Sequence, residues 1–411
     1  MRPSYVVLLL ALSIGYAAEA DYCSAPKNTQ NVIECLNQQN LEMKKLESDT
    51  QAIEGILKSG TQIPNPTVEI ENMQGKSIDG TAGGTRVAIS QLIEIGGKRS
   101  ARRASGEAKA EAFRAASMSL KDQILSENIL RLVKYRQLVG EIAVLQEALG
   151  VYEKVNRQFS SRPKLSPDQQ VNIGIFKLAL GDYRHKLATL VSQKREVEAY
   201  FKVIPNFNLE SAVLYLPKRL TKWPKLTNVD LDISKSPKIK EIESNLKKAQ
   251  ADLDLARANV WPDPTLSLIA SNNVDGAYQY KSYGVAVSFP LPIFNLNGGE
   301  RQQANAEKFR AEIDHRISKQ SLEIQKKNLI ENYAGFVAAL ENAPDPQDTE
   351  KKHRTTENLF YQGVISGTLV IEAHRQILEF TETQNELELE TLQTLFQIYS
   401  MDGKMGDYRY E

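Results

Sequence analysis

The sequence has little of what most membrane-spanning or nucleic-acid-binding proteins require. After the first twenty residues, no apolar run reaches the roughly 18 residues of a membrane-spanning helix. The 51 basic and 51 acidic residues balance, which argues against the strongly basic surface that binds nucleic acid. Aromatic residues make up only 7% of the chain, a proportion typical of helical coils. If the chain crosses a membrane, it must therefore do so with β-strands.

Cysteine is scarce as well, with only Cys23 and Cys35. In an exported chain, two cysteines this close in sequence can close a small loop as a disulfide. The alternative is lipid attachment at Cys23, which needs small residues directly before the cysteine. Because Tyr22 occupies that place, we predict a Cys23–Cys35 disulfide that ties down the N-terminal end.

Residues 1–20 are typical of a secretory signal peptide. Arg2 gives the positive start, residues 6–14 are apolar, and Ala18-Glu19-Ala20 has the small-x-small pattern of a cleavage site. The alternative is a membrane anchor helix, which the shortness of the apolar run disfavours. A cleaved signal would place the mature chain in the periplasm or beyond.

An internal repeat organises the rest of the chain. Residues 64–66 (Pro-Asn-Pro) recur as 262–264 (Pro-Asp-Pro), and residues 87–90 (Val-Ala-Ile-Ser) recur as 285–288 (Val-Ala-Val-Ser), in both cases 198 positions later. Two separate matches at one offset indicate a tandem duplication. The predicted parts are a first repeat at 21–220, a second repeat at 221–400, an equatorial segment at 204–237 and a C-terminal tail at 401–411.

Each repeat has the same predicted order of helix, two strands and further helices. The strands alternate as half-buried strands do, with Val68 and Ile70 opposite Glu69 and Glu71. An ordinary soluble sheet is the alternative, but a strand of about 10 residues has the length that spans a bilayer when tilted. The predicted strands are 65–75, 84–95, 263–272 and 281–293. The predicted helices are one near 33–57, then 97–159, 166–203, 238–260, 298–342 and 349–400.

The predicted helix 97–159 is unusually long. Its 63 residues contain no proline, and its apolar residues recur every three or four positions, which is typical of a left-handed coiled coil. At about 1.5 Å per residue it would run about 95 Å, enough to bridge a periplasm. In the second repeat Pro344 and Pro346 interrupt the corresponding stretch, and there we expect a kink or a loop.

Four strands in one chain require an assembly if they lie in a membrane. Every backbone group in lipid must be paired, so only a closed barrel is stable. The smallest membrane barrels have about eight strands, so several copies of this chain must pool their strands in a ring. Two, three or four copies would each satisfy this requirement.

The motifs resemble those of the TolC family of outer-membrane factors, most closely the CzcC-type heavy-metal efflux group. Three stretches carry the resemblance: residues 65–67 with 91–99, residues 284–294, and residues 361–373 with the coil that follows. The resemblance implies a mainly α protein with membrane β-strands. It implies a trimer with a twelve-stranded β-barrel continued by a twelve-helix α-barrel.

The same resemblance implies a function. The chain would be a passive exit duct in the Gram-negative outer membrane that extends into the periplasm. It would work with a periplasmic adaptor and an inner-membrane pump, with heavy-metal cations or small drugs as cargo. The alternative is a soluble periplasmic coiled-coil scaffold or adaptor, which would have no need for four alternating strands of membrane length.

The connections between paired helices are the best functional candidates, because the family's hairpin tips contact the adaptor and close the periplasmic mouth. The candidate contact residues are Ser161, Arg162, Lys164, Ser166, Gln362, Gly363, Ser366 and Gly367. A simple helix connection is the alternative, since Ser166, Pro167 and Gln169 match a capping box. Asp168 and Glu372 are candidate gate residues, because a ring of acids filters cations. The alternative is that each acid only offsets its helix dipole.

Four charged residues, Glu69, Glu71, Arg86 and Glu94, are expected to face the lumen of the barrel, where water makes charge tolerable. The sequence contains no catalytic constellation and no phosphate-binding glycine loop. The four histidines lack the spacing of metal ligands and are interpreted as surface residues (His185, His315, His353 and His374). We therefore predict no enzyme activity, no cofactor and no metal site.

Overall fold

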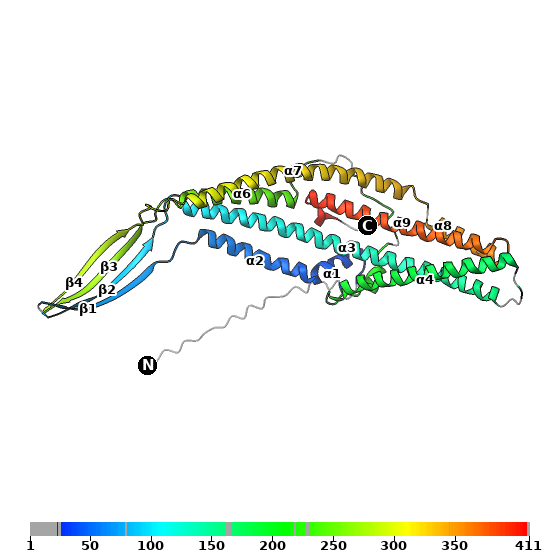
Figure 1. The fold of residues 1–411 in the computed structure, drawn as a ribbon, viewed down its shortest axis with the longest axis horizontal. Helices are drawn as coiled ribbons and strands as arrows, with labels where there is room; N and C mark the ends of the chain where they lie inside the picture. Colours follow the sequence, from blue (N-terminus) through cyan, green and yellow to red (C-terminus); the bar gives the residue numbers. More distant parts are fainter. Residues whose placement is uncertain are drawn as a thin grey trace, which may run out of the picture.

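The protein is an elongated rod with a small β-sheet at one end and packed helices along the rest of its length (Figure 1). The computed structural model describes residues 23, 26–78, 80–160, 164, 166–217, 219–226, 231–344 and 346–408. The predicted signal peptide, 1–20, lies outside these residues.

The elements follow the order that the internal repeat predicted. Those of the first half are α1 (Thr29–Gln39), α2 (Leu41–Thr61), β1 (Thr67–Ser77), β2 (Gly80–Leu92), α3 (Lys98–Ser160), α4 (Pro167–Lys202) and α5 (Leu209–Val213). Those of the second half are α6 (Pro237–Ala258), β3 (Thr265–Asp275), β4 (Tyr278–Ser288), α7 (Gly298–Glu341), α8 (Pro346–Tyr361), α9 (Gly367–Met401) and the 3-10 helix η1 (Met405–Asp407).

The strands form one antiparallel sheet in the order β1-β2-β3-β4. They run further into their hairpin ends than the sequence predicted, so that Gly75 pairs with Ala82 and Ser77 with Gly80 instead of forming a loop. Pairing continues because each added residue satisfies two backbone groups. The β1–β2 turn closes at Gly80, whose φ of 129° suits glycine, and the β3–β4 turn closes at Gly276, with φ 58°.

Register divides the sheet into two faces. Cross-strand partners share a face. We call one the polar face, because hydroxyl groups pair across it at 2.7 Å, Ser90 with Ser267 and Ser271 with Ser282. The opposite apolar face is made by Val68, Ile70, Val87, Ile89, Leu266, Leu268, Ala270, Tyr283, Val285 and Val287.

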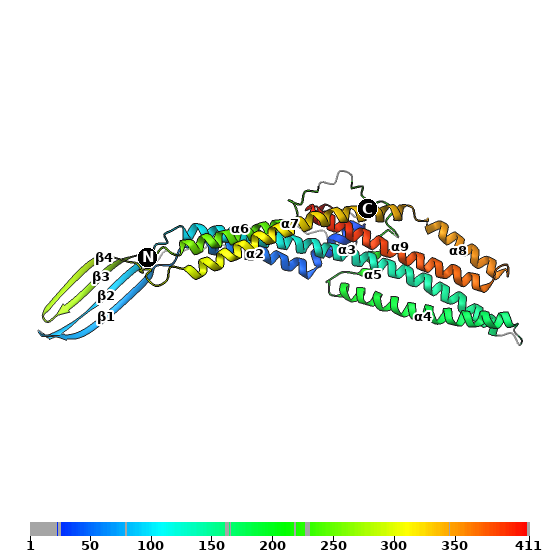
Figure 2. The same cartoon turned by 45° about the horizontal axis from the view of Figure 1, so that its top comes forward.

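Near the sheet, four helices form a layer in the order α2–α3–α6–α7. Farther along, α3 packs against α4 and α9, and α9 also packs against α7 (Figures 1 and 2). The buried core is thickest where these groups meet, around Leu138, Leu145, Leu392 and Leu395, whose side chains are completely buried. Burial of such aliphatic side chains contributes about 2 kcal/mol each to folding.

Two parts of the second half differ from the predicted pattern. The single helix predicted at 349–400 is instead two helices, α8 and α9, separated by Gln362–Ser366. Gly363 permits this break because its φ is 75°, in the left-handed region. The tail after Met401 packs through residue 408: Met405 is buried, and the Tyr408 ring meets Phe396 at 4.9 Å.

Candidate functional site

The connection between α3 and α4 ends in a well-capped helix. Ser166 accepts a hydrogen bond from the Gln169 backbone, and the Gln169 side chain accepts one from the Ser166 backbone, so the capping box predicted from the sequence is present. Lys164 is exposed. Ser161 and Arg162 lie outside the described residues.

The connection between α8 and α9 lies beside the first one. Ser366 caps α9, and Thr368 donates a hydrogen bond to the Asn172 side chain of α4 at 3.0 Å. Gly367 lies directly against the Phe176 ring, where an added Cβ would come within 2.4 Å of the ring. The fold therefore brings the two predicted tips together at the end of the rod away from the sheet (Figure 1).

Of the two candidate gate acids, Glu372 is the one whose side chain the structure describes. Glu372 is half-buried on α9 and paired with Arg375 of the same helix, with oxygens 2.7 and 3.0 Å from the guanidinium nitrogens. The Arg375 guanidinium holds the pKa of Glu372 below its usual value, so this acid is charged and locally compensated. The Asp168 side chain lies outside the described residues.

His374, interpreted from the sequence as a surface residue, is buried and only 2% exposed. Its Nδ1 lies 2.8 Å from the Val370 carbonyl oxygen and its Nε2 3.2 Å from a Glu357 carboxylate oxygen. The ring also meets Tyr152 of α3 edge-on at 5.4 Å. Val370, His374 and Leu378 recur every four residues along α9, and this stripe was the signal that could have predicted burial.

On the sheet, three of the four predicted lumen residues share the polar face. Arg86 and Glu71 are direct cross-strand partners, 2.9 Å apart, and Glu69 lies two residues from Glu71 on the same strand. The fourth, Glu94, follows β2 and forms an ion pair with Arg102 of α3.

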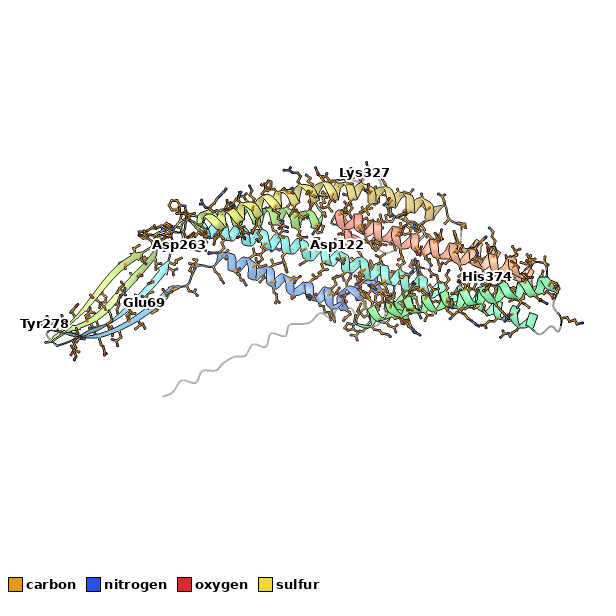
Figure 3. All side chains as sticks on the ribbon, in the orientation of Figure 1. Glu69, Asp122, Asp263, Tyr278, Lys327 and His374 are labelled. Atoms are coloured by element: carbon orange, nitrogen blue, oxygen red, sulfur yellow. A yellow bond between two sulfur atoms is a disulfide. The ribbon has the colours of Figure 1, made fainter. Side chains whose placement is uncertain are left out.

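The tyrosines of β4 do not share one face of the sheet. Tyr283 lies on the apolar face, whereas Tyr278 and Tyr280 lie on the polar face. Tyr278 is at the hairpin end of the sheet (Figure 3). Tyr280 follows Tyr278 by two positions, an even offset, whereas Tyr283 follows Tyr280 by three, an odd offset. Successive strand residues point to opposite faces, so the three tyrosines cannot all share one.

The equatorial segment is held by a buried polar network that the sequence analysis missed. Glu388 of α9 forms an ion pair with Arg136 of α3 and accepts hydrogen bonds from Gln137 at 2.8 Å and from the Leu220 backbone at 2.9 Å. Arg136 also donates to the Pro217 carbonyl. These residues are far apart in sequence, so no local pattern predicts their contact.

The N-terminal end is tied to the same region. The structure joins Cys23 and Cys35 in a disulfide. Next to it, the Thr29 hydroxyl donates a hydrogen bond to the Tyr215 carbonyl at 2.7 Å. The disulfide ties Cys23 to α1, and the Thr29 hydrogen bond holds α1 beside the equatorial segment.

None of the helices among the described residues is both long and apolar enough to cross a membrane. In the same part of the chain, no three His, Cys, Asp or Glu side chains are grouped so that they could hold a metal ion.

Comparison with solved structures defines the class of protein. A membrane protein from Pseudomonas aeruginosa has a TM-score of 0.70 at 14% identity, covering 98% of this chain and 96% of that one. The outer membrane protein VceC of Vibrio cholerae has a TM-score of 0.68 at 14% identity, covering 92% and 96%. The fold is that of the TolC-family outer-membrane channels, and the family resemblance seen in the sequence is confirmed.

Two named proteins are similar to the chain in sequence. The cobalt-zinc-cadmium resistance protein CzcC of Cupriavidus metallidurans is 24% identical over 296 residues, which are 69% of this chain and 67% of CzcC. The pyoverdine export outer membrane protein OpmQ of Pseudomonas aeruginosa is 24% identical over 297 residues, 68% of this chain and 55% of OpmQ. No protein-family model matches the chain. The predicted location in the Gram-negative outer membrane is confirmed by these relatives.

Proposed function

We propose that the protein is one of three identical subunits of a passive outer-membrane exit duct. The observation that carries this proposal is a sheet with two open edges. Strand order makes β1 and β4 the edge strands, and each has a row of backbone groups without a partner in the described sheet. In lipid those groups must be paired, and pairing β4 of one copy with β1 of the next would satisfy them.

The helix layer supports the same head-to-tail ring. Its edge helices are α2, which leads into β1, and α7, which follows β4. α7 exposes a stripe of large apolar residues at Phe309, Ile313, Ile317 and Ile324. α2 exposes a stripe of small residues at Ser48, Ala52, Gly55 and Ser59. Large side chains fit over small ones when helices pack closely, so neighbouring copies could cover both stripes.

In such a ring the apolar face of the sheet would contact lipid and the polar face would line a water-filled lumen. Val68, Ile70, Val285 and Val287 are each more than 60% exposed in the single subunit, an arrangement that lipid would relieve. Toward the hairpin ends the same face becomes polar, as at Lys281, which fits emergence from the membrane. Three copies of four strands would form a twelve-stranded barrel, within the range of known membrane barrels.

At the other end of the rod, the tips are the proposed contact with a periplasmic adaptor and, through it, with an inner-membrane pump. Around them, Val171 and Leu178 of α4 and Val364 between the helices are each more than 60% exposed. Apolar side chains exposed together mark interaction surfaces. The predicted contact residues Lys164, Ser166, Gln362, Gly363, Ser366 and Gly367 lie in or beside the two helix connections at this end.

The proposed activity is conduction without turnover. The two curated relatives are named for different substances: CzcC for resistance to cobalt, zinc and cadmium, and OpmQ for export of pyoverdine. We propose metal cations as the first candidate cargo, from the motif resemblance to the CzcC type, and small organic molecules as the second. On this proposal the chain needs no catalytic residues and no cofactor.

The test is the native mass of the protein extracted from purified outer membranes. We expect release only by detergent, as a trimer. A monomer that salt alone removes from the membrane would contradict the proposal and favour a soluble periplasmic scaffold. An assembly of two or four copies that is released only by detergent would support the proposed duct but contradict the proposed trimer.

A further inference from the structure

Charge is divided unequally between the two faces of the sheet. Among the described strand residues, the polar face carries three acids and one base, Glu69, Glu71, Asp275 and Arg86. The apolar face carries two bases and no acid, Lys76 and Lys281. The polar face therefore has a formal charge of −2 per subunit, and the apolar face +2.

Part of the acidic charge on the polar face is compensated. Arg86 donates a hydrogen bond to Glu71 at 2.9 Å. One guanidinium neutralises one carboxylate, so the Glu69–Glu71–Arg86 group keeps one negative charge. Asp275 adds a second near the hairpin turn.

The position of Glu69 makes its charge effective. Its cross-strand row contains Ala88, Ile269 and Gly284, which offer no cation. Its strand neighbours Val68 and Ile70 point to the apolar face, so in a barrel lipid would lie directly behind it. A low-dielectric wall concentrates the field of a charge into the water of a pore.

Three acids at the two ends of the helical region each have a cationic partner. At the junction of sheet and helices, Asp263 lies 2.7 Å from Lys98, and Glu94 pairs with Arg102. At the tip, Glu372 is paired with Arg375. On the polar face of the sheet, by contrast, the described acids outnumber the bases by three to one.

We propose that Glu69 is the main determinant of ion selectivity in the barrel and makes its lumen prefer cations. The proposal rests on the ring described above, in which threefold symmetry would place three Glu69 carboxylates around one pore. Rings of acidic side chains favour cations over anions in channels. The proposal assigns the selectivity to the sheet and not to the candidate gate acids at the tip.

The experiment measures reversal potentials in planar bilayers that separate two KCl concentrations. Wild-type protein, Glu69→Gln, Glu69→Asp and Lys281→Gln are compared. We expect the ratio of potassium to chloride permeability to be well above one for wild type and to fall by about half or more in Glu69→Gln. Glu69→Asp should retain most of it. Lys281→Gln changes one charge per subunit on the apolar face and should leave the ratio unchanged.

The outcomes separate this proposal from the proposed duct. A wild-type protein that forms no conducting assembly overturns both. A conducting wild-type channel whose ratio is near one, or is unchanged in Glu69→Gln, overturns the selectivity proposal alone. A ratio that changes in Lys281→Gln but not in Glu69→Gln would overturn the assignment of the two faces. Conductance by each variant shows that it has assembled.

Discussion

At the scale of single residues, Gly367 shows how a small side chain sets the geometry of the periplasmic tips. The first turn of α9 approaches α4 so closely that a Cβ on Gly367 would lie 2.4 Å from the Phe176 ring. Phe176 is 2% exposed and sits among other rings, with Tyr152 at 5.9 Å. It therefore has little room to retreat, and glycine is needed here for space.

We predict that Gly367→Ala destabilises the tip by about 1–3 kcal/mol, the usual effect of overpacking. Thermal unfolding in detergent, with limited proteolysis at residues 361–367, measures the effect. Gly174→Ala is the control, because a Cβ there meets nothing within 4 Å, and it should be neutral or stabilising. If adding Phe176→Leu does not restore the stability lost in Gly367→Ala, contact with the Phe176 ring is not the cause of that loss.

Asp122 is a second residue whose buried environment leads to a testable prediction about stability. It lies on α3 in the middle of the rod (Figure 3), is 8% exposed and accepts a hydrogen bond from the Ser400 hydroxyl at 2.8 Å. Burial raises the pKa of its carboxyl above the usual value of 3.8. The folded state therefore binds the carboxyl proton of Asp122 more tightly than the unfolded state does. The free energy of unfolding consequently falls as pH rises from the unfolded-state pKa through the raised one.

We predict that Asp122→Asn stabilises the protein at pH 7 by about 0.5–1 kcal/mol, because it removes a desolvated charge while keeping the acceptor for Ser400. The advantage should disappear when the pH falls below the unfolded-state pKa of Asp122, because the wild-type carboxyl is then protonated in both the folded and the unfolded state. Unfolding midpoints at several pH values measure it, with exposed Asp314→Asn as the control. An advantage that does not vary with pH would contradict this account.

At the scale of elements, Glu388 holds α3, α9 and the equatorial segment together. Its two oxygens serve Arg136, Gln137 and the Leu220 backbone. The side chain is only 2% exposed, and its partner Arg136 is 8% exposed. Removing one member of such a pair leaves the other as a buried, unpaired charge.

We predict that Glu388→Ala lowers stability by about 3–5 kcal/mol. It should also expose residues 217–226 to protease before the helices unfold, since Leu220 loses its anchor. Glu386→Ala, two residues away and exposed, should change neither measurement. If stability is lost without earlier cleavage of the segment, Glu388 supports the helices but does not anchor the segment.

At the scale of the whole molecule, the unpartnered α7 stripe is the feature that a single subunit does not explain. Ile317 is 59% exposed at its centre. We predict that Ile317→Asp reduces the trimer recovered in detergent, because a carboxylate would be buried between copies. Gln325→Asp, also exposed but on a different side of α7 from the stripe, should assemble normally. Equal trimer yields for both variants would place the stripe outside the subunit interface.

The order of elements could be predicted because it depends on local pattern and on the repeat. The period of about 3.5 residues predicted α3 over 97–159, and the structure has it at Lys98–Ser160. The connection at residues 362–367 was predicted as a tip, but the predicted helix 349–400 ran across it, since a glycine is tolerated within helices as well as at their ends. The hairpin ends were misplaced because glycine-rich strands lack the alternation that marks a strand.

By itself, the sequence determined the two repeats, the helix periods and the alternation of the strands, since each reflects residues close together in the chain. It also fixed the side of the strand on which Glu69 and Val68 lie, because successive strand residues point to opposite faces. Only the tertiary structure decided that Glu71 pairs with Arg86, that Gly367 lies against Phe176 and that Glu388 pairs with Arg136. These contacts depend on how separate elements pack, and packing joins residues that no local pattern relates.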